Sequence, residues 1–196
     1  MRRTVINVLA FGGGFVIMSL ELLGGRVLAP YFGSSIYVWG SIITVFMLSL
    51  ALGYLIGGYI SVRGPSLRRF SLLFVAGALL TYPLVLYAEP LMHVVFEHIE
   101  DPRYGSLVAG ATLFMLPTIV LGMISPYSVR LMVTQADHSG SVAGTLYFVS
   151  TLGSALGTLA TSFYLVLWFE IDTIVTLLAA SLLGLAAIGW FAGRRT

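Results

Sequence analysis

The sequence has no cysteine and no lysine among its 196 residues, and only 9% of the residues are charged. Without cysteine, disulfides, thiol nucleophiles and cysteine-ligated zinc are excluded. Without lysine, Schiff-base chemistry and a P-loop lysine are excluded. An ordinary soluble domain has about 25% charged residues. Because 58% of this chain is hydrophobic, the composition predicts an integral membrane protein.

Six apolar stretches are long enough to cross a bilayer, which takes about 20 residues per helix. They are residues 5–29, 36–62, 67–88, 105–133, 141–169 and 172–192. Pro83, Pro117 and Pro126 lie in or near these runs and are expected to kink or end them. We expect the first to be retained as a span, because its apolar run exceeds the roughly 7–15 residues of a cleaved signal peptide. The expected fold is an all-α membrane domain over residues 1–196 with six transmembrane helices.

The arginines are distributed unevenly between the two sides that six spans define. Eight of the ten lie on the side of both termini, leaving only Arg26 and Arg103 on the other. That other side carries the acidic residues Glu89, Glu97, Glu100, Asp101, Glu170 and Asp172. Since cytoplasmic loops are enriched in Lys and Arg, both termini are predicted to be cytoplasmic, in an inner or plasma membrane.

A segment of the first half recurs in the second half. The pattern of residues 38–53 reappears at 142–157, shifted by 104 residues, and the same shift carries Arg26 onto Arg130. Three spans separate the copies, so the second is upside down in a bilayer, as in transporter folds. We predict a 3+3 inverted repeat of residues 1–88 and 105–196. The alternative is chance recurrence of Gly, Ala and Leu.

Residues 89–104 differ from the spans because polar and apolar side chains alternate there at helical spacing. We expect a short amphipathic helix on the outer surface. His93 and Glu97 are one turn apart, which raises the possibility of a metal site. A solvated polar face is the simpler interpretation, so no metal site is predicted.

Four glycines occur in pairs spaced by four residues: Gly53 with Gly57, and Gly153 with Gly157. Small residues at this spacing let helix backbones approach closely where lipid supplies no hydrophobic drive. We interpret them as helix-packing residues. Contacts within one chain are favoured, and contacts between two copies are the alternative.

Glu21 is the most unusual residue of the spans, because it lies deep in the first one, where an ionised carboxylate is costly. Arg26 is its nearest possible partner, and Arg130 is predicted near the opposite surface. One hypothesis makes Glu21, Arg26 and Arg130 substrate-binding residues. The other makes Glu21 a structural carboxyl, neutral or hydrogen-bonded to a neighbouring helix.

Recognisable catalytic motifs are missing. The sequence contains no dinucleotide-binding, zinc-protease, nucleophile-elbow or Walker pattern. We therefore predict no catalytic residue and no cofactor. The arginines cluster at span ends and not on one exposed face, so a nucleic-acid partner is not expected either.

One run of residues resembles a known family. The pattern E-x-x-x-G-R-x-L-A-P-Y-F-G at 21–33, followed by residues 38–40 and 51–58 and later by 122–131 and 144–158, is similar to the membrane module of polytopic spermidine synthase-like proteins. The resemblance implies a major-facilitator-like half of six helices. In that family a cytoplasmic aminopropyltransferase domain follows, and this sequence stops at Thr196, where it would begin. The activity is therefore not carried over to this chain.

Two functions remain open. The chain is either a non-catalytic membrane subunit or anchor that docks a separate synthase-like protein or a larger complex, or a small homodimeric transporter for a polyamine or an amphiphile. We favour the first from sequence. Six helices are only half of a major-facilitator-like bundle, and a midplane site needs two halves, which is the argument for the second.

Overall fold

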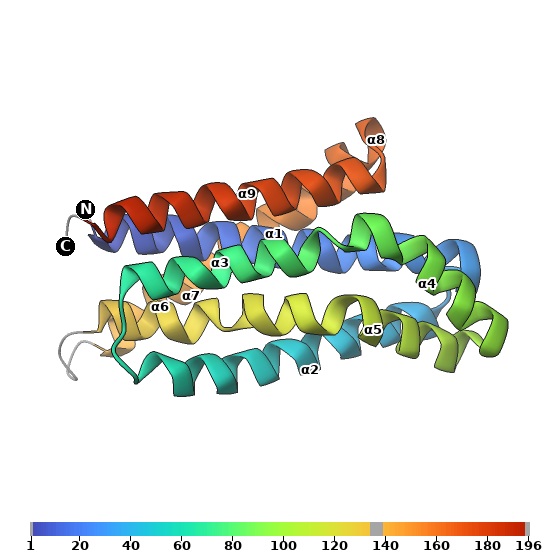
Figure 1. The fold of residues 1–196 in the computed structure, drawn as a ribbon, viewed down its shortest axis with the longest axis horizontal. Helices are drawn as coiled ribbons and strands as arrows, with labels where there is room; N and C mark the ends of the chain where they lie inside the picture. Colours follow the sequence, from blue (N-terminus) through green and yellow to red (C-terminus); the bar gives the residue numbers. More distant parts are fainter. Residues whose placement is uncertain (1, 134–138, 195–196) are drawn as a thin grey trace.

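The computed structural model describes residues 2–133 and 139–194. Every regular element in these ranges is helical (Figure 1). The elements are α1 (Arg2–Phe32), α2 (Ile36–Ser61), α3 (Leu67–Thr81), α4 (Leu84–His98), α5 (Pro102–Gly122), α6 (Ile124–Met132), α7 (Ser139–Ala160), the π-helical turn η2 (Thr161–Leu165), α8 (Val166–Trp168) and α9 (Ile171–Ala192).

Most of these helices are long enough to cross a membrane. Five helical stretches of the described chain qualify by length and hydropathy: Arg2–Phe32, Ile36–Ser61, Pro102–Met132, Ser139–Trp168 and Ile171–Ala192. A sixth span results if α3 and α4, which are bent by 47° relative to each other, are counted together. The predicted all-α membrane fold is therefore confirmed, with its third span broken.

The third span is broken at Pro83, where a kink or an end was expected. The bounds differ from the predicted span over 67–88 and separate helix over 89–104, because α3 ends at Thr81 and α4 runs from Leu84 to His98. Pro83 explains the difference, because proline has no backbone N–H to donate and its ring clashes with the carbonyl one turn back. Residues 84–88 therefore belong to the bent outer helix.

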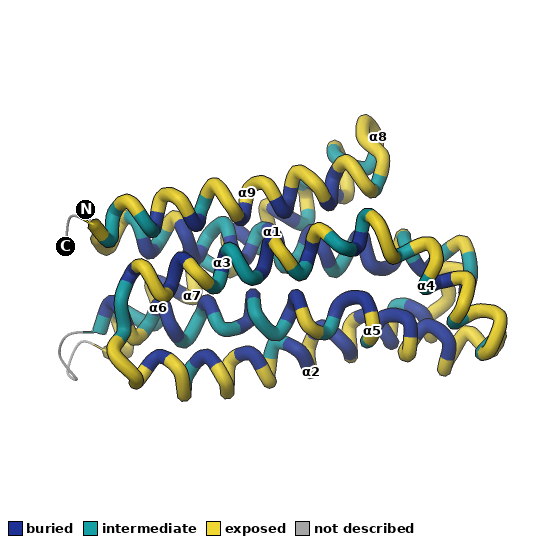
Figure 2. The backbone as a smooth tube through the Cα atoms, viewed as in Figure 1, coloured by how far each residue is buried: buried dark blue, intermediate teal, exposed yellow. Residues whose placement is uncertain are grey.

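The helices form two sides around a central pair, α1 and α5. On one side α7 packs along α1 and α2 packs along α5, which are the two most extensive helix pairings. On the other side α9 contacts α1, α3 contacts α5, and α3 and α9 contact each other. The outward faces of α2 and α9 are exposed, while α1 and α5 carry much of the buried surface (Figure 2).

Aromatic rings fill the space between the helices at two levels. Phe70 of α3 stacks on Tyr127 of α6 with ring centroids 5.5 Å apart, and Phe46 of α2 lies 5.7 Å from Phe114 of α5. All four rings are almost fully buried. Since dispersion and close packing hold membrane helices together, these contacts fix α3 and α2 against the α5–α6 segment.

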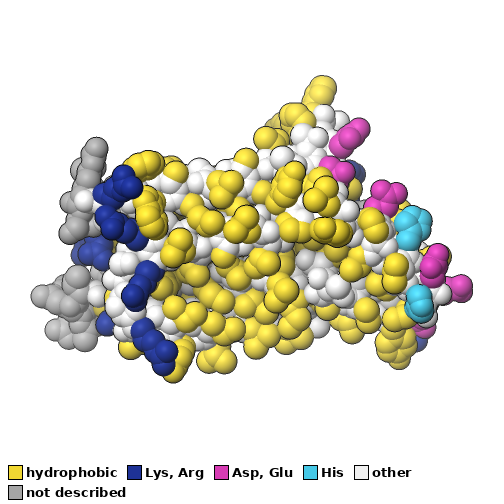
Figure 3. Space-filling model, viewed as in Figure 1, with side chains coloured by type: hydrophobic (Ala, Val, Ile, Leu, Met, Phe, Trp, Pro, Cys, Tyr) yellow, Lys and Arg dark blue, Asp and Glu magenta, His cyan; other side chains and the backbone are white. Residues whose placement is uncertain are grey.

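Charged side chains gather at the two ends of the bundle (Figure 3). The end with both termini, here called the arginine-rich end, carries the described residues Arg2, Arg3, Arg63, Arg68, Arg69, Arg130 and Arg194. The opposite end, here called the acidic end, carries Glu89 and Glu97 of α4, Asp172 of α9, and Glu100, Asp101 and Glu170 between helices. Arg195, which the orientation argument also used, lies outside the described residues.

Candidate ligand cavity

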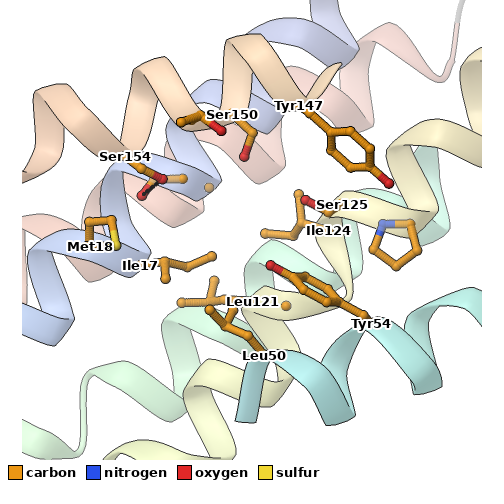
Figure 4. A pocket seen from close by; sticks show the side chains of 15 residues that line it. Ile17, Met18, Leu50, Tyr54, Leu121, Ile124, Ser125, Tyr147, Ser150 and Ser154 are labelled. Carbon is orange, nitrogen blue, oxygen red and sulfur yellow. Dashed lines mark hydrogen bonds between the residues drawn. The ribbon is translucent and has the colours of Figure 1, made fainter. Parts of the chain in front are cut away.

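A cavity of about 470 Å³ lies between α1, α2, the α5–α6 segment and α7. It is near the middle of α1 and α7, and the buried residues Gly13, Gly14 and Leu121 form its floor. Its mouth lies between α2 and α7, where Tyr54 and Tyr147 are 48% and 57% exposed. The lining also includes Ile17, Met18, Leu50, Gly122, Ile124, Ser125, Pro126, Ser150, Thr151 and Ser154 (Figure 4).

The floor of the cavity depends on a close approach of α1 and α7. A side chain at Gly14 would collide with the backbone of Ser150, so only glycine allows these helices to touch here. The hydroxyl of Ser154 donates a hydrogen bond of 3.2 Å to the carbonyl of Gly14. Farther along, the Thr161 hydroxyl donates to that of Ser19 at 2.9 Å. Hydrogen bonds of this kind stabilise packed membrane helices by about 0.6 kcal/mol each.

One wall of the cavity is formed by the break between α5 and α6 at Met123. Pro126 causes it, because proline cannot donate a hydrogen bond to the carbonyl of Gly122, four residues earlier. Gly122 and Pro126 both line the cavity. The kinked helix therefore lacks one backbone hydrogen bond, from residue 126 to Gly122, beside the cavity.

Hydroxyl groups dominate the polar part of the lining. In Figure 4, Tyr54 of α2 and Tyr147 of α7 lie on opposite sides of the cavity, with Ser125 of α6 between them. Ser150 and Ser154 follow Tyr147 along the same face of α7. The cavity therefore combines aliphatic walls, two aromatic rings and several hydrogen-bonding groups, as small-molecule sites do.

Glu21 lies one helical turn beyond this cavity. It is three residues after Met18 and four after Ile17, so it continues the cavity-facing stripe of α1 toward the acidic end. Glu21 is half-buried and is not one of the residues that line the cavity. Ser19, two residues earlier and on another face of α1, is bonded to Thr161 and is not a partner of Glu21. An ionised carboxylate at this depth costs on the order of 2.5 kcal/mol or more.

The two arginines predicted to accompany Glu21 are far apart. Arg26 is exposed on the part of α1 nearer the acidic end, whereas Arg130 is exposed near the end of α6, at the arginine-rich end. The structure therefore does not bring Glu21, Arg26 and Arg130 into one cluster. Of these three, Glu21 is the residue next to the cavity.

The four predicted packing glycines lie at contacts inside the chain. A side chain at Gly53 would collide with the carbonyl of Ile119, and one at Gly57 with the backbone of Met123. On α7, Gly153 and Gly157 face the backbone carbonyls of Phe11 and Phe15. Each pair therefore joins two helices of one chain, α2 to α5 and α6, and α7 to α1.

The bent helix α4 closes the acidic end over α1. The His93 ring lies edge-on to Tyr31 with centroids 5.2 Å apart, and Phe96 packs against Phe32 at 5.7 Å. His98 Nδ1 lies 2.8 Å from the carbonyl of Val94. In the described chain no group of three or more potential metal ligands comes together. His93 and Glu97 thus belong to a packed helix with a polar outer face.

The sequence analysis did not identify Tyr54, Ser125 or Tyr147 as site residues. Their side chains meet only because α2, α6 and α7 are neighbours, and hydropathy does not reveal which helices pair. One local signal was present, since Pro126 directly follows Ser125 and a proline was expected to kink the helix there, but such kinks are common in membrane helices and do not mark a site by themselves. The two tyrosines had no comparable signal.

No family model, curated protein or solved structure matches this chain. The class of protein to which the chain belongs is therefore defined by its fold and its cavity. It is a multi-pass α-helical membrane protein with a cavity among four of its helical segments.

Proposed function

We propose that this chain is one half of a small transporter, which binds its substrate in the cavity and works as a parallel homodimer. The observation that carries the proposal is the position of the cavity, midway along α1 and α7 and beside the kink between α5 and α6. Transporter sites lie near the bilayer midplane, at the interface of repeated units and next to discontinuous helices.

The lining residues support the idea that two related halves form this site. Three pairs of them are separated by the 104-residue shift of the sequence repeat: Ile17 with Leu121, Met18 with Gly122, and Leu50 with Ser154. A binding site between two repeats draws equivalent positions from both of them. We therefore retain the 3+3 inverted repeat as part of the proposal.

The helix pairings also support the repeat. An axis that exchanges the first three spans with the last three converts the α1–α7 pairing into α5–α2, and α1–α9 into α5–α3. All four pairings occur. Superposing residues 2–81 on 102–192 as inverted units is the direct test, and failure of that superposition would leave the sequence match as coincidence.

A second copy accounts for the open side of the cavity. The mouth lies between α2 and α7, which expose large apolar side chains such as Leu55, 73% exposed, and Phe148, 67% exposed. Hydroxyl groups at the mouth are poorly solvated by lipid tails. A partner half placed against α2 and α7 would cover the cavity and complete the midplane site.

Crosslinking tests this arrangement cleanly, because the chain has no native cysteine. Leu55→Cys on α2 should be joined to a dimer by a bis-maleimide in native membranes. The matched control is Leu79→Cys on α3, which is 67% exposed on the opposite side of the bundle and should remain monomeric. Equal crosslinking of both variants, or of neither, would refute dimerisation through α2 and α7.

Transport itself is tested with purified protein in liposomes. We expect the protein to speed the exchange of an NBD-labelled glycosyl ceramide between leaflets, read as loss of dithionite-protected fluorescence. Ser125→Leu fills the cavity and should abolish the acceleration, whereas Thr112→Leu, exposed on α5 beside α3 and α4, should retain it. If the wild-type dimer does not accelerate the exchange, the proposed transport function is refuted.

The orientation of the protein follows from its charges. We infer that the arginine-rich end faces the cytoplasm, since that side is enriched in basic residues in membrane proteins. Val62→Cys lies at this end and Glu100→Cys at the other. An impermeant maleimide should label Glu100→Cys in intact cells and label Val62→Cys only after permeabilisation. The reverse pattern would contradict the inferred orientation.

The anchor function remains a second candidate, favoured by the geometry of the arginine-rich end. Arg68 lies 5.8 Å from the Trp190 ring and Arg63 lies 4.8 Å from the Tyr59 ring, so two of these arginines are held in place by aromatic contacts. We propose that an acidic surface of a synthase-like soluble protein would dock here. Arg63→Gln with Arg68→Gln should then release the co-purifying partner, while Arg103→Gln at the acidic end should not.

A further inference from the structure

The residues that line the cavity indicate the charge of its ligand. Among the described residues that line it, none is an aspartate, glutamate, arginine or histidine. The polar side chains are hydroxyls only, from Tyr54, Ser125, Tyr147, Ser150, Thr151 and Ser154. A hydroxyl both donates and accepts hydrogen bonds and holds no net charge.

The backbone adds an acceptor to these hydroxyls but no charge either. Gly122 lines the cavity, and its carbonyl lacks the usual donor because Pro126 has no N–H. The floor at Gly13 and Gly14 is covered by Ile124 and by α7, and the Gly14 carbonyl already accepts from Ser154. The cavity is therefore suited to a polar group that needs several hydrogen bonds, within apolar surroundings.

A charged ligand would lack a counter-ion in this cavity. An ion that leaves water is stabilised in a protein only when an opposite charge and further hydrogen bonds replace its hydration. The nearest carboxylate on α1 is Glu21, which lies outside the lining and one turn beyond Met18. A polyamine carries several ammonium groups, so most of its charges would remain uncompensated.

We propose that the cavity binds an uncharged amphiphile, which has an apolar body and a hydroxyl, carbonyl or amide head group, and that it discriminates against organic ammonium ions. This inference rests on the proposed function, because it takes the cavity to be the substrate site. The head group would bond near Ser125 and the Gly122 carbonyl. The body would lie against Ile17, Leu50 and Leu121.

Size agrees with this assignment. A volume of about 470 Å³ falls within the range of roughly 300–1,000 Å³ that is typical of small-molecule sites. The two exposed tyrosines at the mouth give an amphiphile a place to pass between bulk lipid or a partner half and the cavity. Their rings are apolar and their hydroxyls polar, so they match both parts of such a ligand.

The test compares two photoreactive probes that differ only in the head group. One is a diazirine-bearing decanol and the other is the corresponding decylamine, which is protonated at neutral pH. Both are irradiated with the purified protein in nanodiscs, and the labelled residues are mapped by mass spectrometry. Labelling of α9, on the far side of the bundle, reports the general concentration of each probe in lipid and normalises the result.

We expect the alkanol to label residues 121–126 and 147–154 at least about tenfold more than the amine does, a ratio that corresponds to about 1.4 kcal/mol. Ser125→Leu and, independently, Ser150→Leu should remove the alkanol labelling, and Thr112→Leu on the exposed face of α5 should not. Two filling variants are used so that misfolding of one does not decide the outcome.

The outcomes separate the inference from the proposed function. Equal or stronger labelling of these residues by the amine would overturn the uncharged-ligand inference and leave the cavity as a binding site. If Glu21→Gln then abolished amine labelling, Glu21 would be its counter-ion. If neither probe labels these residues above the level of α9, the cavity is not a binding site and the proposed function is refuted.

Discussion

Replacing Gly153 by alanine tests the α1–α7 contact on which the cavity depends. The new methyl group would collide with the backbone carbonyl of Phe11, and a backbone atom has no rotamer by which to move away. Either α7 shifts outward or the helix bends, and overpacking of this kind costs about 1–3 kcal/mol. Because the floor of the cavity is formed by Gly14 and its neighbours on α1, a shift of α7 also distorts the cavity.

The matched control is Gly144→Ala on the same helix. A side chain there meets nothing within 4 Å, so the alanine keeps only its advantage in helix propensity, up to about 1 kcal/mol. We therefore expect Gly144→Ala to be neutral or stabilising and Gly153→Ala to be destabilising, a separation of about 1–3 kcal/mol or more in the free energy of unfolding.

The measurement is reversible unfolding in mixed micelles with increasing dodecyl sulfate, followed by circular dichroism or tryptophan fluorescence. Size-exclusion profiles of fluorescent-protein fusions give an independent thermal midpoint. If Gly153→Ala is as stable as Gly144→Ala, the backbones of α1 and α7 are not in direct contact at this level, and the packing argument fails.

Three further results are expected. Thr161→Val removes the hydrogen bond to Ser19 and should cost about 0.6 kcal/mol in the same unfolding assay, while a cost of several kcal/mol would mean that the hydroxyl has a further role. Pro126→Ala restores a donor for the Gly122 carbonyl, so alkanol photolabelling of residues 121–126 should fall; unchanged labelling would show that this carbonyl is not part of the site. Glu21→Gln should leave alkanol labelling unchanged, because Glu21 lies outside the lining, and a loss would place the carboxylate in the site.

The course of the chain through the membrane was largely predictable, because one local property determines it. A span needs about 20 apolar residues whatever its neighbours are, and the predicted ends of 36–62 and 172–192 lie within one residue of α2 and α9. The third span was less accurate. The residues on both sides of Pro83 are apolar, so hydropathy gives no sign of an interruption there, whereas the proline interrupts the backbone hydrogen bonds of the helix.

The site was harder to predict, because it depends on which helices become neighbours. Gly53 and Gly153 were identified from spacing alone, since a small residue every four positions marks a contact face. Tyr54 and Tyr147 have nearly a hundred residues between them, and nothing local relates one to the other. Glu21 attracted attention through its charge, yet the lining beside it is uncharged.

The π-helical turn at Thr161–Leu165 separates α7 from the short helix α8, so the face that each segment turns toward the bundle is set separately. Before the turn, Gly153 and Gly157 fix which face of the helix touches α1. A π turn holds one residue more than an α turn, so the residues after it are rotated by about 100° relative to an uninterrupted helix. Leu167 and Trp168, which are 70% and 78% exposed, follow this turn. Deleting one residue from the turn would rotate Leu167 and Trp168 about the helix axis, while Gly153 and Gly157 would keep their contact with α1.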